Sequence, residues 1–189
     1  DHATRRGLSP KQLLTAFVIA SPEARAAIDE GCYEGTPLSR DDWWAEAAAE
    51  GLLAIENHSW DHLHEVLPSS LQRHGRAGDF HSVDNFDRAE QQLRAAADYI
   101  DEQLGGSGHR TSLFAYPYGQ ARDYLVGDYL PQYGCRRGII GAFTTVQGFV
   151  SADTHRYAIP RLVCGDAWHS PREFEALLSR LVETGGAHV

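Results

Sequence analysis

The sequence alternates short apolar runs with segments of helical period, and this alternation constrains the fold more than any other feature. Apolar runs of strand length occupy residues 12–20, 52–57 and 112–116. The segment 85–104 instead repeats its apolar side chains at steps of three and four residues, as an amphipathic helix does. Strands that alternate with helices are typical of βα units around a parallel sheet, open or closed into a barrel. In such folds, ligands and catalytic groups gather at the carboxyl ends of the strands.

Capping residues indicate where the helices begin. Ser21 and Pro22 suit the N-cap and the first position of a helix that follows the first strand. Ser39 and Asp42 are expected to open a second helix, which Gly51 ends. The remaining expected elements are a long loop at 67–83, a helix over 85–104 capped by Asn85, strands at 138–144 and 157–163, and a last helix that opens at Ser170 and packs through Leu177, Leu178 and Leu181.

Length and charge limit the class of protein. A chain of 189 residues fits a single domain over 1–189, and its net charge of −9 argues against nucleic acid as a partner. No apolar run approaches the roughly 20 residues needed to span a bilayer.

Cys32, Cys135 and Cys164 are too widely spaced for a CxxC pair and are expected to be free thiols. Because the chain begins at Asp1 and shows no secretory segment, we expect a further segment upstream and leave the compartment open.

Two histidines stand four residues apart directly after the second apolar strand. If the chain makes one helical turn after that strand, His58 and His62 project to the same side and can bind one cation at about 2.0–2.1 Å. Neutral imidazole suits zinc first, with cobalt, nickel or iron as alternatives. His64, two residues further on, is expected to face elsewhere. The sequence therefore predicts a divalent-metal site at the carboxyl edge of the sheet.

A second motif follows the strand at 112–116. Pro117 fixes its own φ and lacks an N–H, whereas Gly119 permits an unusual backbone angle. Such a turn can direct the backbone N–H of Tyr118 into a cleft as an oxyanion donor, or it can simply be a tight turn.

Taken together, the two motifs resemble the polysaccharide deacetylase family, the carbohydrate esterases that share a NodB-homology domain. The family's second motif, paired histidines with Ser or Thr after the first, is similar to residues 58–62. Its third motif, an aromatic-x-x-Pro-Tyr/Phe-Gly turn, is similar to residues 114–119, and residues 157–161 resemble a late Pro-Arg strand. The resemblance covers nearly the whole chain.

The resemblance implies a distorted (β/α)7-type barrel and a metal held by two histidines and one aspartate. His58 and His62 correspond to the metal histidines, and Tyr118 corresponds to the oxyanion donor. The family's first motif, a strand that ends in an Asp-Asp pair, does not stand before residue 13, so we expect the barrel to lack its first strand in this chain. Asp1 is then the candidate third ligand. The Asp pair at 41–42 lies in the first turn of a helix, where acids commonly cap.

The remaining catalytic roles fall on two late residues. His169 is the candidate general acid, although it lacks the Leu-x-His context usual in the family. Arg161 is expected to orient a carboxylate or to pair with surface acids. The implied activity is hydrolysis of the amide C–N bond of N-acetylated sugars, not of peptide bonds. Two alternatives remain: an inactive carbohydrate-binding member of the same fold, and a metal-dependent amidohydrolase of small non-sugar amides.

Overall fold

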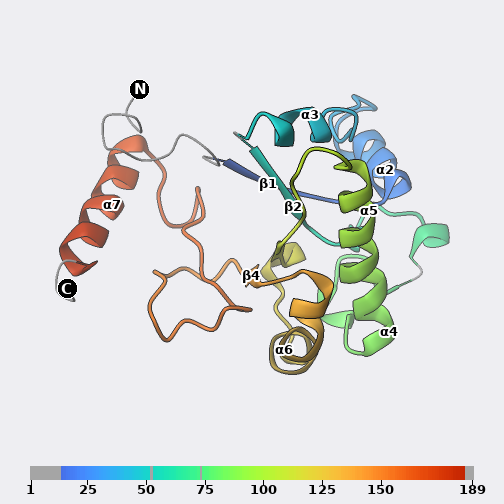
Figure 1. Ribbon diagram of the computed structural model, residues 1–189. Helices are drawn as coiled ribbons and strands as arrows, with labels where there is room; N and C mark the ends of the chain where they lie inside the picture. The colour runs from blue at the N-terminus through green and yellow to red at the C-terminus, as the bar shows by residue number, and fades with distance from the viewer. Residues whose placement is uncertain (1–13, 52, 73, 186–189) are drawn as a thin grey trace.

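The computed structural model describes residues 14–51, 53–72 and 74–185, and these form an α/β fold around a parallel sheet (Figure 1). Its strands pair in the order β1-β2-β3-β4. They are β1 (Leu14–Val18), β2 (Leu53–Asn57), β3 (Leu113–Ala115) and β4 (Gly141–Phe143). The helices are α2 (Pro22–Cys32), α3 (Trp44–Ala49), α4 (Phe86–Ala89), α5 (Ala95–Gln103), α6 (Leu130–Tyr133) and α7 (Pro171–Gly185). The 3-10 helical segments are η1 (Ser69–Leu71), η2 (Phe80–Ser82), η4 (Pro117–Gly119) and η6 (Gly134–Arg137), and the π-helical segments are η3 (Glu90–Arg94) and η5 (Tyr124–Tyr129).

The strand register places all the strand ends that carry motifs at one edge of the sheet. β1 and β2 pair from Leu14↔Leu53 to Val18↔Asn57, so His58 follows level with the end of β1. β3 continues this register through the pair Asn57↔Phe114. The predicted meeting of the two motifs at the carboxyl edge is therefore observed.

A closed seven-stranded barrel is not confirmed, because the described part of the chain supplies four strands. The sheet is nevertheless strongly curled. In a flat sheet, strands about 4.8 Å apart would leave β1 and β4 about 14 Å from each other. The rings of Phe17 in β1 and Phe143 in β4 instead meet edge to face, with centroids 5.6 Å apart.

The predicted strand at 157–163 is wrong. This segment contributes a single parallel bridge, between Ile159 and Phe143. The ladder ends there because the Thr144 carbonyl accepts from Arg161 Nε, whereas Arg161 N donates to Val146 O at 2.9 Å.

Several helix predictions are confirmed, with differences at their ends. The Ser21 hydroxyl caps α2 by accepting from Ala24 N at 3.1 Å, and Asn85 caps α4 by accepting from Arg88 N. The predicted opening of α3 at Ser39 and Asp42 is wrong, since that helix begins at Trp44 without a side-chain cap. The helical run from η5 to η6 was not predicted. On α7, Leu177 is buried as expected, whereas Leu178 is exposed.

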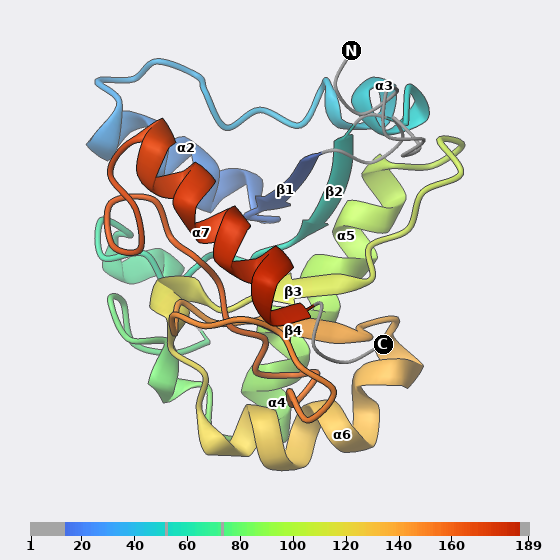
Figure 2. The same ribbon diagram turned by 90° about the vertical axis from the view of Figure 1, so that its left-hand side faces the viewer.

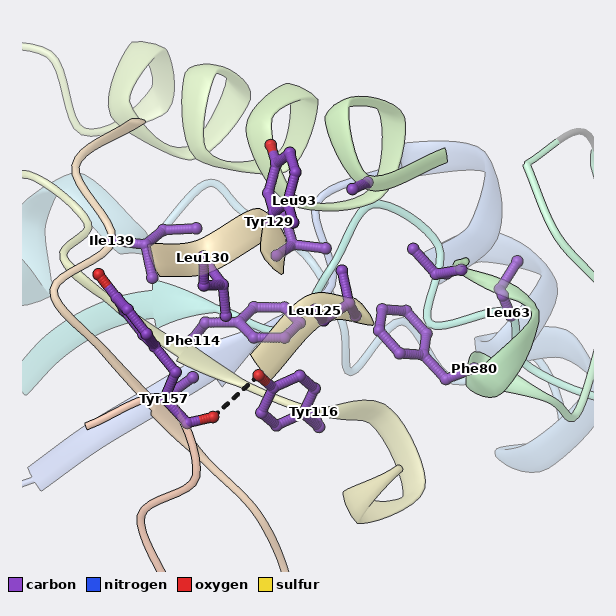
Figure 3. Close-up of a cluster of buried hydrophobic side chains, with 13 residues drawn as sticks. Leu63, Phe80, Leu93, Phe114, Tyr116, Leu125, Tyr129, Leu130, Ile139 and Tyr157 are labelled. Carbon is purple, nitrogen blue, oxygen red and sulfur yellow. Dashed lines mark hydrogen bonds between the residues drawn. The ribbon is translucent and has the colours of Figure 1, made fainter. Parts of the chain in front are cut away.

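The core lies between the sheet and the helices on one of its faces. Figure 3 shows the larger cluster, in which β3 packs against η5, α6 and the α4–α5 helix. Its polar edge is closed by the Tyr116 hydroxyl, which donates to the Tyr157 carbonyl at 2.9 Å. A second cluster joins β2 to α3 and α5. α7 lies on the opposite side of the sheet from α4 and α5 (Figures 1 and 2).

Two surface properties complete the description. Cys32, Cys135 and Cys164 are free, exposed thiols. Within the described ranges, no helix is both long and apolar enough to cross a membrane.

Truncating the centre of the larger core cluster should destabilise the fold strongly. Leu93 is fully buried, so Leu93→Ala leaves a cavity and should lower the free energy of unfolding by about 2–5 kcal/mol. The matched control is Leu38→Ala, because Leu38 is 60% exposed and should change stability by less than about 0.5 kcal/mol. Urea unfolding measures both variants, and equal effects would contradict the assignment of this core.

Candidate active site

The loop after β2 brings the two histidines together, but not through the helical turn that the sequence suggested. Ser59, His62 and Leu63 adopt left-handed backbone angles, with φ of 74°, 63° and 46°. The imidazole rings of His58 and His62 lie with centroids 4.8 Å apart and planes at 72°. A sharply reversed loop, and not an α-helical turn, therefore sets the pair.

Short polar side chains within the loop hold this backbone. Asn57 Oδ1 accepts from Ser59 N at 2.8 Å, and Ser59 Oγ accepts from His62 N at 2.9 Å. Asp61 Oδ1 accepts from Leu63 N at 2.9 Å. Asn, Ser and Asp favour such turns because their side chains bond to nearby backbone amides.

A π-helical turn in the neighbouring helix fixes the loop from outside. In η3, the Gln92 carbonyl accepts from Trp60 N and the Leu93 carbonyl accepts from Asn57 Nδ2, both at 2.8 Å. The Gln92 side chain donates to Asp61 Oδ1 at 2.8 Å. A π turn widens the helix and disrupts its α-helical ladder, which leaves carbonyls available to partners. Sequence periodicity predicted an uninterrupted α-helix here and missed this support.

His58 is held as a neutral ring with one nitrogen unused. Its Nδ1 lies 2.7 Å from the Ala115 carbonyl, which can only accept, so Nδ1 carries the hydrogen and Nε2 is left as the lone-pair nitrogen. Burial lowers the pKa of His58 to about 4; the Ala115 bond opposes this shift and the charge of Arg161 adds to it. The ring is therefore neutral at pH 7, as a metal ligand must be.

His62 is neutral for the same main reason. Burial lowers its pKa to about 3, and the neighbouring His58 and His64 contribute further. Its Nδ1 is buried and has no hydrogen-bond partner among the residues that the structure describes. The expectation that His64 faces elsewhere is wrong, because the reversed backbone at His62 and Leu63 places the His64 ring 5.4 Å from that of His62.

A third ligand does not join the histidines within residues 14–51, 53–72 and 74–185, where no group of three His, Cys, Asp or Glu side chains could hold a metal. The candidate Asp1 lies outside the described residues. Asp41 bonds instead to Arg25 and Tyr99, and Asp42 forms a surface ion pair. Burial alone would raise the pKa of Asp41, but these hydrogen bonds outweigh it and leave the pKa lowered. Asp41 is thus bonded to α2 and α5, and Asp42 to a neighbouring surface arginine.

The aromatic-Pro turn packs directly on the histidine pair. Tyr118 is left-handed, with φ of 56°, and its ring centroid lies 4.5 Å from that of His62. The turn closes through Gly119 N to the Tyr116 carbonyl at 2.9 Å. In the described part of the chain, the backbone N–H of Tyr118 has no acceptor. It is therefore free to donate to a ligand.

The two late candidates lie in different surroundings. Arg161 is partly buried, its Nε donates to the Thr144 carbonyl at 2.6 Å, and it is close enough to lower the pKa of His58. His169 is 66% exposed and lies 3.4 Å from Glu173 at the start of α7. The structure brings Arg161 to the site and leaves the role of His169 a prediction.

A cavity of about 220 Å³ adjoins His58 at the carboxyl end of β1. Its walls come from β1, α2, the segment between α2 and α3, and the start of α3. They include Phe17, Ser39, Arg40, Trp43 and Trp44. Trp43 is 38% exposed, so an aromatic surface stands beside the histidine pair.

Comparison with protein families matches residues 11–137 to polysaccharide deacetylase. The chain belongs to the polysaccharide deacetylase family. This match covers both the histidine pair and the Tyr118 turn, which the sequence resemblance had singled out. No curated protein matches the chain.

Solved structures similar to this family member are also deacetylases. The deacetylase PplD of Streptococcus pyogenes, solved in complex with acetate, is 19% identical with a TM-score of 0.54 over 86% of this chain and 57% of its own. A de-N-acetylase from Aggregatibacter actinomycetemcomitans is 18% identical, with a TM-score of 0.47 over 72% and 52%. The BpsB deacetylase domain from Bordetella bronchiseptica is 21% identical, with a TM-score of 0.44 over 64% and 47%. The chain thus spans about half the length of these structures, and the similarity to PplD concerns the fold alone.

Gly119 should be irreplaceable in this deacetylase-family turn. Its φ is 69°, and an added Cβ would lie 1.9 Å from Thr145 Oγ1, so Gly119→Ala should lower the free energy of unfolding by more than about 2 kcal/mol. Gly127→Ala is the matched control, because Gly127 is helical with open space around it and should be neutral or slightly stabilising. Thermal unfolding compares the two, and a tolerated Gly119→Ala would contradict the geometry of the turn.

The metal-free protein should lose stability as the pH falls below about 6.5. His58 and His62 have pKa values of about 4 and 3 when folded and 6.5 ordinarily, so between these limits the unfolded chain binds more protons. Stability is then fully present above the ordinary pKa and falls as the pH decreases.

Urea unfolding with a chelator, at about pH 7 and about pH 5, measures this loss. His58→Gln cannot take up the proton and should lose less stability over the same interval. The exposed His81→Gln should behave as the wild type. An identical pH dependence in wild type and His58→Gln would refute the assignment.

Proposed function

We propose that this chain removes acetyl groups from N-acetylated sugars by hydrolysing their amide C–N bond. One observation carries the proposal: two half-buried, neutral imidazoles converge beside a backbone N–H that has no acceptor among the described residues. Membership of the polysaccharide deacetylase family supports the same reaction. The finer fold that we propose is a distorted (β/α)7-type barrel, to which the curled four-stranded sheet would belong.

The chemistry of the donor set fits a divalent metal. His58 presents Nε2 with its tautomer fixed by Ala115, and the buried Nδ1 of His62 is without a partner among the described residues. Imidazole nitrogens suit zinc, with cobalt, nickel or iron as alternatives. We propose an aspartate outside the described residues as the third ligand, with Asp1 as the candidate within the sequence. When bound, such a metal lowers the pKa of water and polarises a carbonyl.

The chain's own residues contribute positioning and electrostatics. The N–H of Tyr118 would donate to the oxygen that becomes negative as the acetamide carbonyl is attacked. Loss of one such donor typically slows a reaction by roughly 10²–10³. The left-handed angle of Tyr118 is held by Gly119 and the closed turn, so the donor is oriented before the substrate arrives.

Proton transfer requires groups beyond the pair. We propose that a carboxylate outside the described residues removes a proton from water, and that His169 protonates the leaving amine. His169 would have to approach from the start of α7, where it now pairs with Glu173. Arg161, near His58, would orient the carboxylate. The exposed ring of Trp43 beside His58 offers a surface against which a sugar can stack.

A second candidate function is binding without turnover. It is favoured by the lack of a third ligand among residues 14–51, 53–72 and 74–185. Such a protein would hold an N-acetylated sugar beside the histidines and release no acetate.

Replacing His58 tests the proposal directly. His58→Ala should weaken metal binding by more than the roughly 10–100-fold that loss of an outer-shell partner costs, and should abolish acetate release. The measurements are elemental analysis of bound metal and acetate release from N-acetylglucosamine oligomers. The exposed His81→Ala is the matched control and should retain both.

Equal metal content in wild type and His58→Ala would exclude the proposed site. A wild type that binds metal through His58 but releases no acetate would favour the binding-only function.

A further inference from the structure

A second cavity, of about 470 Å³, adjoins the histidine loop at Trp60 and Asp61. It is lined by the first turn of α2, by residues of the loop after β2, and by the η3–α5 helix. It shares no lining residue with the cavity at His58. Its volume is in the range of small-molecule sites, about 300–1,000 Å³.

Asp61 gives this cavity a carboxylate with one oxygen left for a ligand. The residue is 3% exposed, and its Oδ1 accepts from Leu63 N and from the Gln92 side chain. Its Oδ2 accepts no hydrogen bond from the described residues, and Asp61 lines the cavity. The carboxylate is thus fixed through two hydrogen bonds on Oδ1, and Oδ2 is left to accept hydrogen bonds from a ligand in the cavity.

The other walls favour a cation that carries hydroxyl groups. Glu23 supplies a second carboxylate, and Gln91 and His74 supply further polar groups. Trp60 supplies an aromatic surface, held in place by the Tyr99 ring at 5.9 Å. Among the described lining residues there is no lysine or arginine. Carboxylates bind ammonium groups, and aromatic faces bind both ammonium groups and the apolar faces of sugars.

We propose that this cavity binds an amino-sugar unit, with the ammonium group at Asp61 and Glu23 and the sugar ring beside Trp60. The inference rests on the proposed function, since deacetylation produces this unit. An N-acetylated unit has no cation and a larger substituent, so the cavity distinguishes product units from substrate units. A partly deacetylated polymer would thus be held at a site apart from the histidine pair.

NMR titration of the indole N–H of Trp60 tests this inference, with its signal assigned through Trp60→Phe. The ligands are glucosamine, N-acetylglucosamine, glucose and ethylamine, at about pH 7, where an amine is largely protonated. Glucosamine should give a saturable shift, with binding about tenfold or more tighter than that of the other three. Equal binding of N-acetylglucosamine overturns the proposal, as does the absence of a saturable shift. Equal binding of ethylamine overturns its sugar component.

Two variants locate the ammonium group. Asp61→Asn keeps an oxygen for Leu63 and Gln92 but removes the charge, and should weaken glucosamine binding about tenfold. Glu23→Gln lies at the surface, should fold whether or not Asp61→Asn does, and should weaken binding about threefold. Glu46→Gln, on α3 away from the cavity, is the matched control and should bind as the wild type. Unchanged binding in Glu23→Gln and Asp61→Asn overturns the assignment.

The two proposals fail separately. Acetate release without glucosamine binding refutes only the amino-sugar site. Glucosamine binding without acetate release refutes only the proposed catalytic activity.

Discussion

The site depends on the hydrogen bonds that join the histidine loop to the π-helical turn η3. Three residues of this loop are left-handed without being glycine, and each such conformation costs roughly 1–3 kcal/mol. The loop can hold them because Asn57, Trp60 and Asp61 are bonded to Gln92 and Leu93 in an environment shielded from water. Buried polar groups are strongly destabilising when unpaired, so the loop has few alternative conformations. The positions of the His58 and His62 rings are therefore well defined.

Burial then gives the loop its chemical character. Both imidazoles have pKa values well below the ordinary 6.5, so they present lone pairs at neutral pH instead of repelling a cation. The same burial makes the metal-free site unfavourable, because the His62 Nδ1 lacks a partner among the described residues. The Tyr118 turn adds a preoriented donor beside these rings. A cation held by these nitrogens would polarise a carbonyl, and the free N–H would stabilise the charge that develops on its oxygen.

Sequence reasoning located the elements that depend on local patterns and missed those that depend on packing. The apolar runs of β1 and β2 and the caps Ser21 and Asn85 were readable, because hydrophobic periodicity and capping act within a few residues. The strand expected at 157–163 did not form, because the Thr144 carbonyl accepts from the Arg161 side chain and not from the Arg161 backbone. Local sequence does not encode that contact. The π turn at Glu90–Arg94 could not be predicted, because the hydrogen bonds that accompany it go to the loop after β2, which is distant in the sequence. The histidine pair itself was found from spacing, although its backbone is not helical.

One loop forms a wall of both cavities, and this links the two proposals. Asp61 and His62 are consecutive, yet Asp61 lines the second cavity while the His62 ring packs against His58 and Tyr118. Asp61 Oδ1 also accepts from Leu63 N, so a ligand in the second cavity would contact the carboxyl group that helps to fix the backbone after His62. A cation at Oδ2 would leave that contact in place, because Oδ1 keeps its two donors. A ligand in the second cavity is therefore compatible with an intact histidine pair. A product unit held there during further turnover requires this compatibility.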